Sequence, residues 1–165
     1  MGVAHDTVAG EARAAEIERV YREGGARMWH AILAFAGDRE VANDAVAEAF
    51  AQALRRGDQV RDPERWIWRA VFRIAAGELK DRSRRMHERT LAIPQEMEEP
   101  ARDLVGALSR LTRMQRGAVV LHHLVGHPVK ETAAILGSTP AAVKVHLSRG
   151  RRRLRTILEE EDDEA

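Results

Sequence analysis

The sequence predicts an all-α protein made of two small helical domains that a flexible linker joins. Apolar residues recur at spacings of three and four through most of the chain, which is the period of a helix buried on one side, and strand-like alternation is nearly absent. Residues 86–100 break this period, contain two prolines and mix both charges, as linkers do. We therefore expect domains at residues 16–85 and 101–158 of this 165-residue chain, between a disordered segment 1–15 and an acidic tail 159–165.

Composition excludes several classes of protein. Apolar residues make up 44% of the chain and charged residues 32%, a balance typical of soluble globular proteins. The absence of cysteine excludes disulfides, thiol redox chemistry and cysteine-ligated zinc within this chain. No apolar run approaches the roughly 20 residues of a membrane span, and the N-terminus lacks a signal-peptide pattern, so we expect a cytoplasmic protein without membrane contact.

Charge is distributed unevenly along the chain. The formal net charge is only +1, but six of the 26 acidic residues form the run 159–164. The rest of the chain carries 20 acidic residues against 27 lysines and arginines, which suggests an anionic partner, most simply nucleic acid. The acidic run is typical of a solvated, disordered end, although it could also mimic DNA and restrain the basic helix beside it.

The first domain begins with two helices. The first is expected to end at Gly37, and the Gly24-Gly25 pair should weaken it by roughly one kcal/mol per glycine relative to alanine. Asp38 is a candidate N-cap for the second helix, which Gly57 ends. The apolar stripes are Ile17, Val20, Tyr21, Met28, Ile32 and Phe35 in the first helix and Ala42, Val46, Ala49, Phe50 and Ala53 in the second.

A third helix has the clearest start signal in the chain. Asp62 is placed to cap it, and Pro63 fits the first turn, where a missing backbone N–H costs nothing. Trp66, Ala70 and Ile74 recur every four residues and predict its buried side. The start of this helix is aromatic and its end is strongly basic, a combination useful to a protein that handles nucleic acid.

The second domain ends in a predicted helix-turn-helix at residues 128–155. A short amphipathic helix over 129–136 is followed by Gly137, which can adopt positive φ, and by a serine and a threonine that can cap the next helix. Val143, Leu147, Gly150 and Leu154 give the second helix one buried stripe, and its basic residues lie outside that stripe. A charge run alone usually indicates only a solvated surface, but the turn chemistry favours a helix that enters a DNA major groove. The earlier helices of this domain carry Leu104, Val105, Leu108, Leu111, Met114, Ala118, Leu121 and Val125.

Residues 57–62 (GDQVRD) form a short polar loop before the third helix, and the family resemblance described below implies that this loop captures bases. Capture of an unstacked base needs hydrogen-bonding groups beside aromatic or apolar surfaces. Trp66 or Trp68 could support the base, and the alternative for either ring is core packing. Basic side chains of the helix would then hold phosphates without reading sequence. The candidate residues are Asp58, Gln59, Val60 and Arg61 in the loop, with Arg65, Trp66, Trp68, Arg69, Arg73, Lys80 and Arg82 in the helix.

These features, in this order, resemble the sigma-70 family of bacterial RNA polymerase sigma factors, specifically the small extracytoplasmic-function (ECF) type. The resemblance covers residues 17–158. Residues 42–54 (ANDAVAEAFAQAL) resemble the region-two helix that binds the clamp helices of the largest polymerase subunit, and residues 57–68 resemble the loop and helix start that open the minus-ten element. Residues 126–155 resemble region four, which reads the minus-thirty-five element.

The resemblance implies a protein that binds core RNA polymerase through region two, and the flap of the second-largest subunit through region four, and that directs promoter recognition and melting. An anti-sigma factor is a possible further partner. The implied polymerase contacts are Asp44, Ala47, Glu48 and Gln52. The minus-thirty-five contacts we expect are Lys144, Val145, Ser148 and Arg149 on bases and Thr139, Arg151 and Arg152 on phosphates.

Two positions depart from the family pattern. The family often has a glutamine where this chain has Ala47. Its promoter-melting helix usually shows an asparagine and then an aspartate downstream of the tryptophan, where this chain reads VFRIAAGELKD. The minus-ten sequence that the family reads therefore cannot be transferred to this chain.

Other functions fit the sequence less well. His122, His123 and His127 lack a further ligand at matching spacing, so we expect no metal site. The chain offers no nucleophile, phosphate loop or paired acid and base, so we expect neither catalysis nor a cofactor. The main alternative is a stand-alone helix-turn-helix regulator that binds duplex DNA as a dimer, in which the clamp-helix pattern would have no use. A protein-binding helical adaptor would not need the outward arginines.

Overall fold

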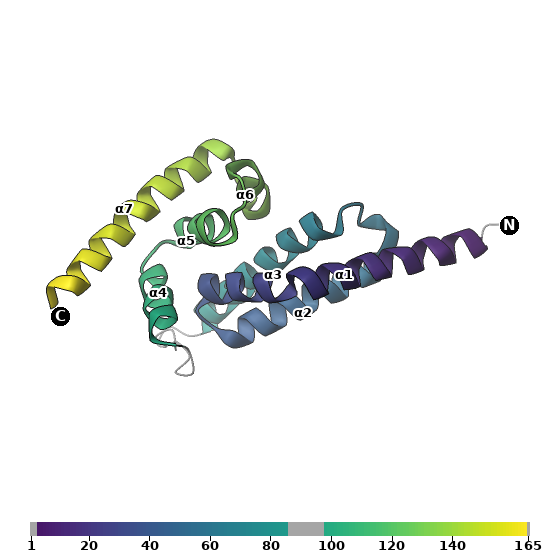
Figure 1. The fold of residues 1–165 in the computed structure, drawn as a ribbon, viewed down its shortest axis with the longest axis horizontal. Helices are drawn as coiled ribbons and strands as arrows, with labels where there is room; N and C mark the ends of the chain where they lie inside the picture. Colours follow the sequence, from purple (N-terminus) through teal and green to yellow (C-terminus); the bar gives the residue numbers. More distant parts are fainter. Residues whose placement is uncertain (1–2, 86–97, 165) are drawn as a thin grey trace.

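A computed structural model describes residues 3–85 and 98–164 of the chain, with side chains for 8–84 and 98–160. Within these ranges every regular element is helical and no strand is present, which confirms the predicted all-α class. In Figure 1 the helices of the N-terminal half lie side by side, and the helices of the C-terminal half lie against one end of them. No helix in the described ranges is long and apolar enough to span a bilayer.

Three helices form the first domain. They are α1 (Val3–Ala36), α2 (Arg39–Arg56) and α3 (Pro63–Arg85), with a 3-10 turn, η1 (Gly57–Gln59), after α2. Asp38 caps α2 as predicted, because its Oδ1 accepts hydrogen bonds from the backbone N–H groups of Glu40 at 2.8 Å and Val41 at 3.1 Å. The small buried residues of α2 let it pack closely on both neighbours.

The second domain holds the predicted helix-turn-helix. It comprises α4 (Glu99–Ser109), α5 (Arg113–Val119), the π-helical turn η2 (Val120–Val125), α6 (Val129–Leu136) and α7 (Pro140–Glu164). Gly137 ends α6 at φ 64°, in the left-handed region that glycine adopts without strain. Thr139 then caps α7 by accepting a hydrogen bond from Ala142 N–H at 3.2 Å. The motif at 128–155 therefore has the helices and the turn that the sequence predicts.

Three predicted boundaries differ from the observed ones. Helix α1 extends back to Val3, whereas the sequence predicts disorder over residues 1–15. Helix α4 begins at Glu99, inside the predicted linker, of which residues 86–97 lie outside the described part. Helix α7 continues to Glu164, through most of the predicted tail. Glu160, near the start of that tail, forms an ion pair at 2.9 Å with Arg110, the residue that follows α4. This pair gives the start of the acidic run a structural role.

The two domains pack directly on each other. Arg116 of α5 donates from Nη1 to the carbonyl of Phe35, in the last turn of α1, at 2.9 Å, and from Nη2 to the carbonyls of Ser109 and Leu111 at 3.1 Å. Gly117 follows Arg116 in α5 and leaves room for the Leu136 side chain, because a Cβ added at Gly117 would come within 2.8 Å of it. The buried apolar residues of both domains consequently form one continuous cluster.

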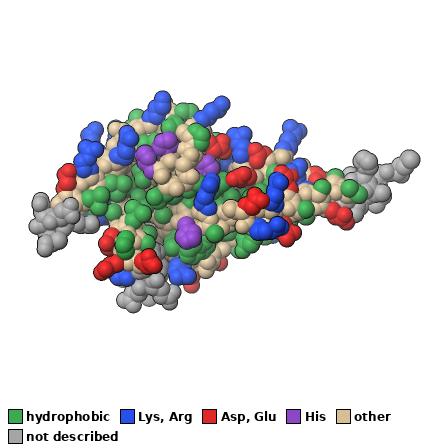
Figure 2. Space-filling model, in the orientation of Figure 1, with side chains coloured by type: hydrophobic (Ala, Val, Ile, Leu, Met, Phe, Trp, Pro, Cys, Tyr) green, Lys and Arg blue, Asp and Glu red, His purple; other side chains and the backbone are tan. Residues whose placement is uncertain are grey.

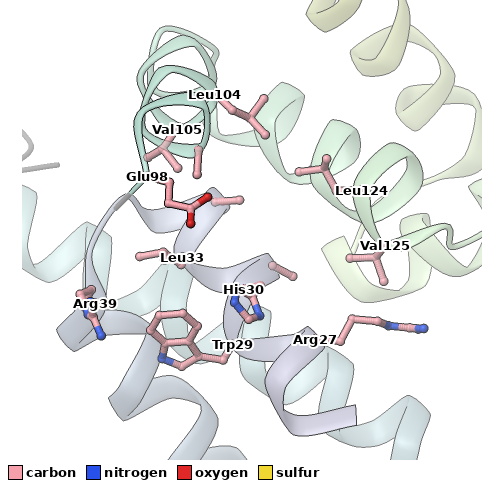
Figure 3. A pocket seen from close by; sticks show the side chains of 13 residues that line it. Arg27, Trp29, His30, Leu33, Arg39, Glu98, Leu104, Val105, Leu124 and Val125 are labelled. Atoms are coloured by element: carbon pink, nitrogen blue, oxygen red, sulfur yellow. The ribbon is translucent and has the colours of Figure 1, made fainter. Parts of the chain in front are cut away.

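A hollow of about 520 Å³ lies between the domains. Helix α1 supplies Trp29, His30 and Leu33 to one wall, while Leu104 of α4 and Leu124 of η2 line the other (Figure 3). The two leucines are 42% and 49% exposed, so the hollow opens a partly apolar surface to solvent.

Candidate nucleic-acid interface

Helix α7 presents the predicted minus-thirty-five residues to solvent. Its buried side is formed by Val143, Leu147, Gly150 and Ile157, which fix the helix against the domain. Figure 2 shows basic side chains along the edge of the molecule where α7 lies. All the predicted contacts are exposed on this helix or its cap: Thr139, Lys144, Val145, Ser148, Arg149, Arg151 and Arg152. An anchored helix with an exposed basic face can read base edges in a major groove.

The predicted base-capture loop also forms a hollow. It has a volume of about 490 Å³ and lies between the loop and the first turns of α3. Asp62 caps α3 by accepting a hydrogen bond from the backbone N–H of Arg65 at 3.1 Å, which fixes the geometry of the loop. The lining residues are Gln59, Arg61, Asp62, Arg65, Trp66 and Arg69. The hollow thus combines hydrogen-bonding groups, cations and one aromatic ring, as capture of an unstacked base requires. Asp58 is exposed beside it.

Arg56 contacts a residue that lines this hollow, and the sequence does not predict this contact. Its guanidinium lies over the Trp66 ring, 5.5 Å from the ring centroid. Trp66 is only half-buried, so this cation–π contact holds an indole that is otherwise partly open to solvent. The contact joins the end of α2 to the start of α3 across a loop, and a basic residue at a helix end carries no signal for it.

Two predicted DNA contacts are wrong for this arrangement. Val60 is 1% exposed and Trp68 is 2% exposed, so neither side chain reaches DNA. Trp68 packs on the His127 ring, with centroids 4.9 Å apart, and the guanidinium of Arg27 lies 5.8 Å from its centroid. The physical reason is that α1, α2 and α6 all pack on α3. Together they bury a wider arc of the α3 surface than a single stripe of residues would cover. Trp66 and Ile74 consequently lie at the margin of the buried side, with Ala70 within it.

The predicted phosphate contacts on α3 divide into two groups. Arg69, Arg73 and Lys80 are exposed, and Arg73 donates to the side-chain oxygen of Gln52 at 3.3 Å. Arg82 instead binds Asp38 and Glu40, the latter at 3.2 Å. Because two carboxylates hold it at the N-terminus of α2, Arg82 ties α3 to α2 in this arrangement, and its role as a phosphate contact stays a prediction.

The residues predicted to contact polymerase form one stripe on α2. Asp44, Ala47 and Glu48 are exposed and Gln52 is half-buried, on the side opposite the buried alanines of the helix. Glu48 accepts hydrogen bonds from the side chains of Gln52 at 2.9 Å and Arg55 at 2.8 Å. These hydrogen bonds lower the pKa of Glu48, so the stripe keeps its negative charge at neutral pH.

His127 lies at the contact between the domains, on Trp68. Its Nε2 is buried and has no hydrogen-bond partner among the described residues, while its carbonyl accepts a hydrogen bond from the His122 ring at 2.7 Å. Burial lowers the pKa of His127 below its ordinary value of 6.5, and nearby Arg27 lowers it further, against the opposite influence of Glu131 and Glu64. The neutral ring is therefore the form that fits this contact.

We expect the stability of the protein to depend on pH through His127. A group whose pKa is lower in the folded than in the unfolded chain favours folding above its ordinary pKa, and that contribution is lost as the pH falls through about 6.5 and below. Thermal unfolding between pH 8 and pH 5.5 should show a fall in Tm that is smaller for His127→Phe, which keeps a ring on Trp68. An identical fall in both proteins would contradict this role.

A known protein family resembles part of this chain in sequence, and solved structures resemble it in fold. The family model described as "Sigma-70, region 4" matches residues 101–154, the domain that holds the helix-turn-helix. No curated protein sequence matches the chain. The solved structure of the sigma factor RpoE in complex with the anti-sigma factor NepR, from Bartonella quintana, is similar, with a TM-score of 0.75 and 20% identity over 87% of this chain and 97% of the other. The structure of CnrH in complex with the cytosolic domain of CnrY has a TM-score of 0.66 and 23% identity, over 92% and 98% of the two chains.

The similarity to these structures covers both domains, and at such identities it establishes the fold. The family match identifies the second domain independently, by its sequence. Both findings agree with the resemblance that the sequence indicates: residues 101–154 match the model of sigma-70 region four, and the chain has the two-domain fold of these solved structures.

Proposed function

We propose that this protein is an ECF-type sigma factor: it binds core RNA polymerase, recognises a promoter at its minus-thirty-five and minus-ten elements, and supports melting of the DNA. The observation that carries the proposal is the presence, on one chain, of an exposed basic recognition helix in one domain and a polar, aromatic hollow in the other. Duplex recognition needs the first and capture of a displaced base needs the second. This activity would place the protein in the cytoplasm, with polymerase and promoter DNA.

The stripe on α2 supports the polymerase part of the proposal. Asp44 and Glu48 present two carboxylates on a helix face that has no packing role in the fold. A regulator that works without polymerase would not need such a face. Region four would contact the flap of the second-largest subunit, and the chemistry of RNA synthesis would remain with the core enzyme.

Transcription in vitro tests the proposal. Purified core RNA polymerase, with and without this protein, is supplied with a library of promoter sequences, and the RNA start sites are determined. Initiation at a defined pair of elements, dependent on this protein, is the expected result. Tight dimeric binding to duplex DNA without any binding to core polymerase would instead identify a stand-alone regulator.

An anti-sigma factor is a further partner in this proposal. The similar RpoE structure was solved with its anti-sigma factor bound. In this chain, the hollow between α1 and α4 offers a partly apolar surface made by both domains. A protein that binds there would hold the domains together, and its addition should inhibit initiation in the transcription assay. Unchanged initiation with such a protein bound would remove it from the regulation we propose.

Arg149→Ala is expected to weaken recognition of one promoter position selectively. Arg149 is exposed on α7, whose buried side carries Leu147 and Gly150. Loss of a bidentate contact to one base costs about 1–3 kcal/mol, and the discrimination at that base pair should relax. Binding of the minus-thirty-five duplex library measures both effects. An equal loss on every sequence would reduce Arg149 to a phosphate contact.

A further inference from the structure

A residue of the helix-turn-helix domain binds a residue of the minus-ten hollow. Glu131, on α6, accepts from Arg65 Nε at 3.3 Å through one carboxylate oxygen and lies 3.1 Å from Arg65 Nη2 through the other. The Glu131 side chain is only 20% exposed, while Arg65 is 56% exposed. The pair joins two residues that are 66 positions apart in the sequence. It is therefore a contact between the domains.

The contact occupies the groups that DNA would need. Arg65 lines the hollow together with Trp66 and Arg69. A guanidinium binds carboxylate and phosphate with the same fork of N–H donors, so a carboxylate held at two points competes directly with a DNA phosphate. The other carboxylate near Arg65, that of Asp62, lies farther away, at 4.0 Å.

We call the arrangement in which Glu131 binds Arg65 closed. In it, the recognition helix lies too near the minus-ten hollow for the protein to read both elements of a promoter. Pro140, where the recognition helix begins, lies nine positions after Glu131, and this stretch spans at most roughly 30 Å even when fully extended. The start of the recognition helix therefore lies close to the hollow. Two promoter elements about two duplex turns apart, at roughly 34–36 Å per turn, lie well beyond that reach. One molecule in this arrangement cannot engage both elements.

We propose that Glu131 is an internal competitor for the minus-ten site, which holds Arg65 and keeps the free protein closed until polymerase or DNA separates the domains. This inference rests on the proposed function. It adds to that function a residue of the minus-thirty-five domain that controls access to the minus-ten site.

Charges elsewhere at the same contact make the closed state easy to open. Arg69 and Arg73 of α3 and Arg113 of α5 line one hollow of about 400 Å³ between the domains. Within the described part of the chain, no ion pair joins a carboxylate to any of these three arginines. Their mutual repulsion opposes closing. The attraction between Glu131 and Arg65 is thus set against like charges across the same interface.

Glu131→Gln tests the competition in the protein without polymerase. The ligand is a single-stranded DNA carrying the minus-ten element that the transcription assay defines. We expect this variant to bind the strand about three- to ten-fold more tightly than the wild type. Glu64→Gln is the matched control, because it removes the same charge from the exposed residue next to Arg65 without breaking the ion pair. An equal gain in both variants would overturn the proposal, since general electrostatics would then account for it.

A cross-link tests the need for opening. The chain has no cysteine, so Glu64→Cys combined with Lys130→Cys gives one defined pair of thiols on either side of the contact. A short bis-maleimide bridge should lower initiation at least ten-fold relative to the same protein without the bridge. Equal initiation by the bridged protein would overturn the proposal and leave the sigma function standing. Failure of the unbridged variant and of the wild type to initiate would refute the proposed function, and this inference with it.

Discussion

Trp68→Ala is expected to destabilise the folded protein by about 3–5 kcal/mol, the usual cost of removing a fully buried aromatic side chain. Trp68 is 2% exposed and touches both domains, because the Phe72 ring lies beside it on α3 and the His127 ring lies on it from the helix-turn-helix domain. The cavity left by the indole would lie at the junction of the two domains. Urea unfolding followed by circular dichroism measures the change.

The control for this variant is Trp68→Phe, which keeps an aromatic ring and should lose clearly less stability. The indole Nε1 of Trp68 is buried without a hydrogen-bond partner among the described residues, so neither variant leaves a partner unsatisfied. The difference between the two variants therefore reports packing alone. A loss below about 1 kcal/mol for Trp68→Ala would show that the ring is not part of the core, in conflict with its burial here.

Local signals in the sequence predicted the helices well. Asp38, Asp62 and Thr139 cap the helices for which the sequence predicts a polar cap, and Gly37, Gly57 and Gly137 follow helix ends with positive φ. These residues act through hydrogen bonds and backbone dihedrals within a few positions of themselves. No knowledge of the remaining fold is needed to recognise them.

The side that a helix buries was harder to predict, because it depends on how many neighbours cover the helix. The period of α3 indicates one stripe through Trp66, and the structure buries Trp68 instead, since α6 packs on a face that the sequence leaves open. Two tryptophans separated by one residue point about 200° apart on a helix. Only the tertiary arrangement decides which ring enters the core.

Contacts between the domains could not be predicted from the sequence at all. Arg116 donates to the carbonyl of Phe35, and Arg65 binds Glu131, over separations of 81 and 66 residues. Arginine and glutamate are common on helix surfaces, and their usual role there is solvation. The periodicity places each residue on its own helix without showing which residue of the other domain it meets. The control that we assign to Glu131 is therefore visible only in the structure.

Trp66→Ala should leave the fold intact and impair promoter opening, in contrast to the change at Trp68. Trp66 is half-buried, lines the minus-ten hollow and packs under Arg56, so truncation removes a surface on which a displaced base can stack. Stacking of one base on an aromatic side chain is worth about 1–3 kcal/mol, which predicts a loss of about 5- to 150-fold in binding of the minus-ten strand by the complex with core polymerase.

The two DNA substrates separate this role of Trp66 from a general defect. Binding of the minus-thirty-five duplex, which α7 reads, should be unchanged in Trp66→Ala, and Trp66→Phe should restore much of the binding to the single strand. The unfolding free energy should change by clearly less than in Trp68→Ala, because the Trp66 ring is only partly removed from water. Equal losses on the duplex and on the single strand would mean that Trp66 supports the fold rather than the captured base.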